Sequence, residues 1–164
     1  ALRDQMRAEA IAVLVQNSGK TYIEAGQIHY PLWQALRRRL PAGYPLRVHF
    51  LMADVVRKLG TRRHLFGPGD LLTLYYRFHP RGRYRTEDLF AARALIYNKL
   101  ILKDEIAADA EAYPHTRDEL AVGSVTDQLS LHDCRRLYPR VRLASTREAR
   151  EIVGRYLRSR RGSG

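Results

Sequence analysis

The chain of 164 residues carries 29 Lys and Arg against 17 Asp and Glu, a formal net charge of +12 at pH 7. Hydrophobic residues make up 45% of the sequence, which excludes a wholly disordered chain. The single cysteine, Cys134, excludes an internal disulfide, and no apolar run approaches the roughly 18 to 20 residues that span a membrane. We therefore expect one soluble, cytoplasmic domain over 1–164. The start at Ala1 rather than Met leaves open that this is a piece of a longer chain.

The first third of the sequence predicts a helix, a strand, a second helix and a second strand. Apolar residues at helical spacing predict helices over 3–16 and 31–40. Short β-prone or apolar runs predict strands over 21–25 and 46–52. A strand, a helix and a strand within about 30 residues are typical of a βαβ unit, in which the two strands are parallel.

The remaining elements are predicted to be helical, with one more strand. A capping residue followed by apolar residues at helical spacing marks most of these helices. The predicted helices cover 53–59, 71–78 after Asp70, 86–108, 116–123, 130–137 and 145–158, and the third strand covers 140–144. The expected fold is therefore α/β, helix-rich, with a small and mostly parallel sheet in a three-layer arrangement.

Three polar residues follow the first two predicted strands. In an open parallel sheet, ligands bind beyond the carboxyl ends of the strands, where Glu24, His29 and Asp54 would lie. Carboxylate oxygens suit a hard cation such as Mg²⁺, and a metal there would support hydrolysis. The same three residues are thus the candidate catalytic and metal-binding residues, and a divalent metal is the cofactor they predict. Alternatively, they are turn, capping or packing residues.

Arginine dominates the basic residues, since four of the 29 are lysine and 25 are arginine. Its planar fork of donors suits phosphate and carboxylate. The run at 81–85 interleaves a tyrosine with arginines, a pattern that would bind phosphates and stack a base. With the basic C-terminal helix it gives the candidate anion-binding residues Arg81, Arg83, Tyr84, Arg85, Arg155 and Arg158. The alternative is a solvated basic surface.

Two stretches resemble known families. Arg3-Asp4, Met6, residues 8–12 and the run from Tyr22 to His29 resemble the closing motif of the TraB/Tiki/ChaN-like superfamily, including its Gly-x-x-His turn. The resemblance covers about residues 3–48 and implies an α/β fold with His29 at a metal- or haem-associated site. The family also has an earlier strand with a Gly-x-x-His motif of its own, and this sequence has no such motif before residue 3.

The strand and turn at Glu24 also resemble the opening of a Toprim domain, in which a glutamate and a later Asp-x-Asp bind magnesium. In this sequence Asp54 is not followed by a second aspartate two residues later.

These observations support three hypotheses about function. The first is binding of a polyanion, above all nucleic acid, because the net charge is strongly positive. The second is a metal-dependent hydrolase-like domain with its site at the strand ends. The third is a non-catalytic domain that binds a protein partner or a second copy of itself. Whether the protein is an enzyme is left open by the sequence.

Overall fold

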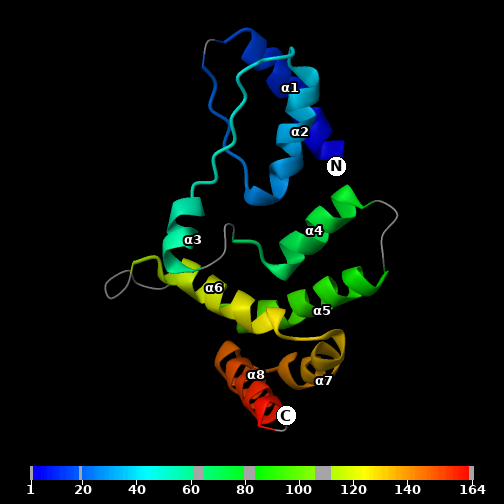
Figure 1. Ribbon diagram of the computed structural model, residues 1–164, viewed down its shortest axis with the longest axis vertical. Helices are drawn as coiled ribbons and strands as arrows, with labels where there is room; N and C mark the ends of the chain where they lie inside the picture. The colour runs from blue at the N-terminus through cyan, green and yellow to red at the C-terminus, as the bar shows by residue number, and fades with distance from the viewer. Residues whose placement is uncertain (1, 19, 61–64, 80–83, 106–111, 163–164) are drawn as a thin grey trace. The chain divides into compact units, whose positions relative to one another are not determined.

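The computed structural model describes residues 2–18, 20–60, 65–79, 84–105 and 112–162. These residues form helices and connecting segments only, and they contain no β-strand (Figure 1). The chain divides into two compact units, Ala1–Leu51 and Met52–Gly164. None of the helices in the described ranges is both long and apolar enough to cross a membrane.

The first unit is built on two packed helices, α1 (Leu2–Gln16) and α2 (Tyr30–Arg39), with the short 3-10 helix η1 (Gln27–His29) leading into α2. Alanines on α1 permit close packing against leucines of α2. The buried residues of this core are Ala8, Ala12, Val15, Leu32, Ala35, Leu36 and Leu40. The predicted helices 3–16 and 31–40 are thereby confirmed to within a residue or two.

The predicted α/β fold is wrong, because segments 21–25 and 46–52 are not strands. Ile23 and Leu46 each pack against the α1–α2 core, but Val48 and Leu51 are exposed. A β-prone run forms a strand only where a neighbouring strand pairs with it and a buried face packs on it. No strand among the described residues pairs with either segment, so both remain connections without ladder hydrogen bonds, and residues 51–52 form a turn.

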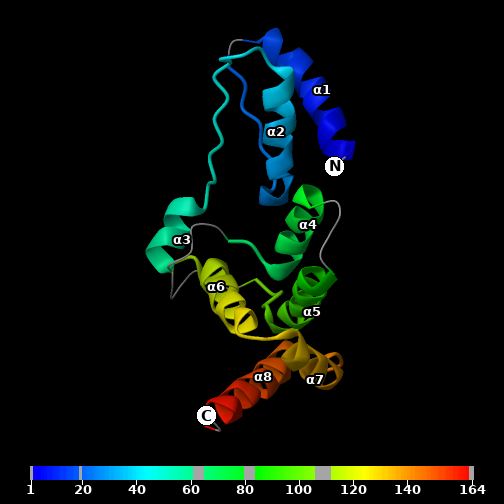
Figure 2. The ribbon, with the colours of Figure 1, turned by 45° about the vertical axis from the view of Figure 1, so that its right-hand side comes forward.

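The second unit contains the other described helices (Figures 1 and 2). They are α3 (Ala53–Leu59), α4 (Pro68–Phe78), α5 (Tyr84–Leu100), α6 (Pro114–Asp127), α7 (Leu131–Val141) and α8 (Thr146–Arg161). Helix α5 packs against α4, α6, α7 and α8, and α7 also packs against α8. The helix predicted over 53–59 is confirmed.

Helices α5 to α8 share one hydrophobic core. Its buried residues are Ile96, Leu100, Val122, Leu129, Cys134, Leu137, Val141, Ala149 and Val153. Burial raises the pKa of the Cys134 thiol, which is consistent with a packing role for the chain's one cysteine.

Several predicted helix boundaries move because tertiary contacts set the ends. Helix α5 ends at Leu100 rather than near 108, since Arg150 donates to the Leu100 carbonyl at 2.7 Å and Asp118 accepts the Leu102 amide at 3.0 Å. Helix α4 begins two residues before Asp70, whose carboxylate instead accepts the Gly67 amide at 3.0 Å. Helix α6 runs through Gly123, which was predicted to end it.

The strand predicted over 140–144 is also wrong. Helix α7 continues through Pro139 to Val141, because Cys134, Leu137 and Val141 lie on one helical face and are all buried. Residues 142–145 form the turn to α8. The caps predicted at Ser130 and Ser145 are confirmed, because their hydroxyls accept the amides of Asp133 and Glu148, three residues on.

The Ser145 cap should contribute measurably to stability. Substitution Ser145→Ala removes the acceptor for the Glu148 amide and should lower the free energy of unfolding by about 1 kcal/mol. Urea denaturation followed by far-UV circular dichroism measures the change. Ser145→Thr keeps a capping hydroxyl and should remain close to wild type, whereas an equal loss in both variants would contradict the capping role.

Candidate nucleic-acid interface

One group of arginines in the second unit is occupied by internal contacts. Arg93 donates to the Leu129 carbonyl at 2.8 Å and to the Asp127 carbonyl at 2.6 Å. These hydrogen bonds supply donors to carbonyl oxygens at and just after the end of α6. Arg150 joins α8 to the end of α5 and forms a 2.6 Å ion pair with Asp118. These arginines therefore serve as links between helices.

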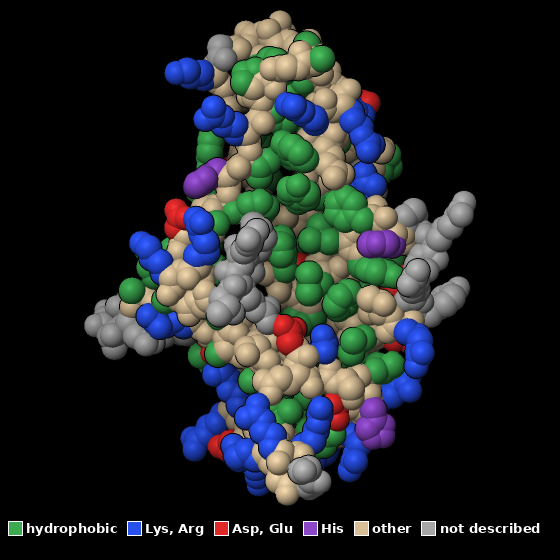
Figure 3. All heavy atoms as spheres, in the orientation of Figure 1, with side chains coloured by type: hydrophobic (Ala, Val, Ile, Leu, Met, Phe, Trp, Pro, Cys, Tyr) green, Lys and Arg blue, Asp and Glu red, His purple; other side chains and the backbone are tan. Residues whose placement is uncertain are grey.

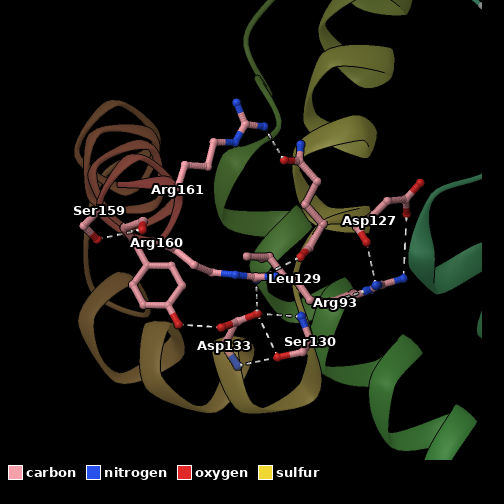
Figure 4. Close-up of polar contacts among 10 residues, drawn as sticks. Arg93, Asp127, Leu129, Ser130, Asp133, Ser159, Arg160 and Arg161 are labelled. Carbon is pink, nitrogen blue, oxygen red and sulfur yellow. Dashed lines mark hydrogen bonds and ion pairs between the residues drawn. The ribbon is translucent and has the colours of Figure 1, made fainter. Parts of the chain in front are cut away.

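Asp133, at the start of α7, is the centre of a polar network that holds α8 in place (Figure 4). Its buried carboxylate accepts hydrogen bonds from the Ser130 amide at 2.8 Å, from the Tyr156 hydroxyl and from Arg160 at 2.8 Å. Arg161 reaches the Gln128 side chain at 2.8 Å beside it. The C-terminal part of α8 is thus fixed against the α6–α7 connection.

Burial of Asp133 by itself raises its carboxyl pKa, but hydrogen bonds from Tyr156 and Ser130, together with the charge of Arg160, bring the pKa below its ordinary value. The pKa of Tyr156 is raised in turn, chiefly because its hydroxyl donates to that carboxylate. The carboxylate of Asp133 is consequently ionised near neutral pH and available to anchor the arginine.

A second group of arginines, on α7, on α8 and in the turn between them, is exposed. Its members, which we call the α7–α8 arginine surface, are Arg135, Arg136, Arg140, Arg142, Arg147, Arg155 and Arg158. Arg147 forms a 3.4 Å ion pair with Glu151. In the part of the chain that the structure describes, the other six side chains form no hydrogen bond or ion pair.

The local charge balance leaves this surface strongly positive. Residues 131–162 contain ten arginines and three carboxylates, and each of these carboxylates is bound within the unit. The carboxylates are Asp133, Glu148 and Glu151. Figure 3 shows basic side chains, in blue, gathered over α7 and α8. Such a concentration of arginine forks raises the local concentration of a phosphate-rich ligand.

The predicted anion-binding residues are divided between two places. Arg155 and Arg158 are exposed on α8 and belong to the α7–α8 arginine surface. Arg85 is exposed in the first turn of α5, fifteen residues before Leu100, so about 22 Å of helix separates it from the contact of Leu100 with α8. Arg81, Arg83 and the side chain of Tyr84 lie outside the described residues, so their role stays a prediction.

The predicted metal-binding residues lose the sheet edge that was to bring them together. Glu24 is exposed on the segment before η1, and His29 binds the buried Asp4 through Nδ1 at 2.9 Å. Asp54 belongs to the second unit and forms an ion pair with Arg57 one turn along α3. No group of three or more His, Cys, Asp or Glu side chains within the described ranges is arranged to hold a metal ion.

Sequence reasoning missed Asp4 as the partner of His29 and the arginines of α7 as part of the exposed basic surface. Arg140 and Arg142 were assigned to the strand predicted over 140–144, and Arg135 and Arg136, on the helix predicted over 130–137, were not named among the anion-binding residues. The periodic burial of Cys134, Leu137 and Val141 is the signal that places Arg135, Arg136, Arg140 and Arg142 away from the core.

Comparison with known proteins gives one informative relationship. No protein-family model matches the chain, and no solved structure matches it significantly. A protein of Archaeoglobus fulgidus, described only as uncharacterized, is 34% identical over 140 residues, which is 85% of this chain and 46% of that protein. The chain therefore spans less than half the length of the relative that it matches.

This relationship extends through most of both units and carries no description of activity. It leaves the resemblance to the TraB/Tiki/ChaN-like superfamily as a prediction, whose implied α/β fold the helical structure contradicts.

Proposed function

We propose that the protein binds nucleic acid through the α7–α8 arginine surface. The observation that carries the proposal is the separation of arginines into two groups on the same helices. Arg150 and Arg160 are bound to carboxylates and carbonyl oxygens, whereas six arginines of the α7–α8 arginine surface make no such contact within the described residues. Arginine side chains that form no hydrogen bond or ion pair within the described residues are available to bind a ligand.

The arrangement favours a phosphate-rich polymer over a small anion. Arg147, Arg155 and Arg158 follow one exposed side of α8 and extend over about 16 Å of its length. A polymer with evenly spaced phosphates can contact such a row at several points, and each contact releases counterions. The core beneath, with Ala149 and Val153 buried, keeps the row on a rigid element.

Binding should therefore depend steeply on salt concentration. We expect the protein to bind a fluorescently labelled oligonucleotide at low salt, with log K falling linearly as log salt rises. A triple variant should bind more weakly and show a smaller slope of log K against log salt; its substitutions are Arg142→Gln, Arg155→Gln and Arg158→Gln. The magnitude of this slope should fall by about 2 to 3, since each phosphate contact contributes about 0.7 to 0.9. Fluorescence anisotropy titrations over a range of salt concentrations measure both quantities.

The matched control removes three positive charges from the first unit. Arg3, Arg38 and Arg47 are exposed there, and their substitution by glutamine should leave the slope unchanged. If both triple variants reduce the salt slope by the same amount, binding depends on the net charge of the protein and not on the α7–α8 arginine surface. The absence of wild-type binding at low salt would reject the proposed function altogether.

A further inference from the structure

Tyr138 is an exposed aromatic residue within the α7–α8 arginine surface. It keeps 37% of its surface accessible and borders the face of α7 on which Cys134, Leu137 and Val141 are buried. Arg135 precedes it by three residues, and Arg142, the residue that caps the end of α7 with a helical backbone, follows it by four, so the three side chains lie along one ridge. The two arginines are about 10 Å apart along the helix axis, with the tyrosine between them.

Tyr138 differs in its contacts from Tyr156, the tyrosine of α8. Tyr156 packs against the core and donates its hydroxyl to Asp133. Tyr138 is absent from that core, and its hydroxyl has no hydrogen-bond partner among the residues described. A partly exposed ring that makes no hydrogen bond or ring contact among the described residues, and that is set between two exposed arginines, has the composition of a base-stacking site.

We propose that the ligand is single-stranded nucleic acid and that Tyr138 stacks on an unpaired base while Arg135 and Arg142 hold the phosphates on either side. The inference rests on the proposed function and adds the ligand class to it. A base within a duplex is stacked on its neighbours and presents only its edge, so it offers no face to the ring. An unpaired base offers its whole face, and stacking of this kind is tolerant of sequence.

The test compares two substitutions of Tyr138 on two ligands. Tyr138→Leu keeps an apolar side chain but removes the ring, and Tyr138→Phe keeps the ring but removes the hydroxyl. We expect Tyr138→Leu to weaken binding of a single-stranded oligopyrimidine by about tenfold or more. Its binding of a duplex of the same length should change by less than about twofold, and Tyr138→Phe should bind both ligands as wild type does. Anisotropy at one low salt concentration gives the affinities, and thermal melting confirms that both variants are folded.

A direct readout of stacking comes from Tyr138→Trp. Addition of the single-stranded oligonucleotide should quench the fluorescence of the new tryptophan, and the signal of the native Trp33 in the wild-type protein provides the background. Normal salt-dependent binding by a Tyr138→Leu variant with wild-type affinity would overturn the stacking inference alone. A wild-type preference for the duplex would overturn the assignment of ligand class. Failure of the wild-type protein to bind either ligand would instead remove the proposed function on which the inference rests.

Discussion

Replacement of Leu137 by alanine should destabilise the second unit by about 2 to 5 kcal/mol. Leu137 has no exposed surface and belongs to the core that α5, α6, α7 and α8 share. The substitution removes buried methyl groups and leaves a cavity, which four packed helices can fill only partly. Because α7 and α8 carry the arginine surface, the variant should also lose nucleic-acid binding as it unfolds.

Urea denaturation followed by far-UV circular dichroism measures this change. Leu143, in the turn after α7, is 88% exposed, and Leu143→Ala removes the same side-chain atoms with an expected effect within about 0.5 kcal/mol. Similar losses in the two variants would show that Leu137 is not in the core described here.

Replacement of Asp133 by asparagine should lower the free energy of unfolding by about 1 to 3 kcal/mol at neutral pH. The carboxylate accepts hydrogen bonds from Ser130, Tyr156 and Arg160, and the amide of asparagine carries no charge and accepts through one oxygen only. The expected loss stays below that of a fully buried pair, because the Arg160 side chain is 55% exposed and solvent screens its charge.

The same substitution should change the response to acid. Since the pKa of Asp133 is lower in the folded protein than in the unfolded chain, its stabilisation is complete above the unfolded pKa and is lost as the pH falls through the folded value. Stability of the wild-type protein should therefore decrease below about pH 4, and Asp133→Asn should flatten this decrease. Glu148, whose pKa the Ser145 amide and hydroxyl also lower, leaves a residual dependence in the variant.

Thermal melting between pH 3 and pH 7 measures the acid response of both proteins. Asp127→Asn provides the control, because this carboxylate is 45% exposed and lies 3.9 Å from Arg93. Its loss should cost less than about 1 kcal/mol. An acid response in Asp133→Asn as steep as that of the wild type would assign the dependence to other carboxylates.

The success of the helix predictions has a local cause. Apolar residues three and four positions apart place the helices 31–40 and 53–59, and the serines at 130 and 145 mark where α7 and α8 begin. A capping side chain and the amide that it binds are three residues apart, so the sequence contains both partners of the contact. The boundaries that moved, such as the end of α5, depend on Arg150 and Asp118 from later parts of the chain.

The strand predictions failed because a strand depends on a partner that the local sequence does not specify. The segments 21–25 and 46–52 have β-prone residues, yet no strand among the described residues pairs with them, and only Ile23 and Leu46 of these segments pack against the α1–α2 core. The hypothesis of a metal site at Glu24, His29 and Asp54 depended on a sheet edge, and it lost its basis with the sheet.

The sequence alone determined the positive charge, the richness in arginine and most of the helices of this protein, because composition, periodicity and caps are local properties. Only the tertiary structure decided which arginines bind within the fold and which are exposed. Arg160 binds Asp133 from 27 residues away, and Arg150 binds the Leu100 carbonyl from 50 residues away. In the sequence, an arginine that binds such a distant partner cannot be told from an arginine that is exposed. Only the packing of the helices distinguishes the two.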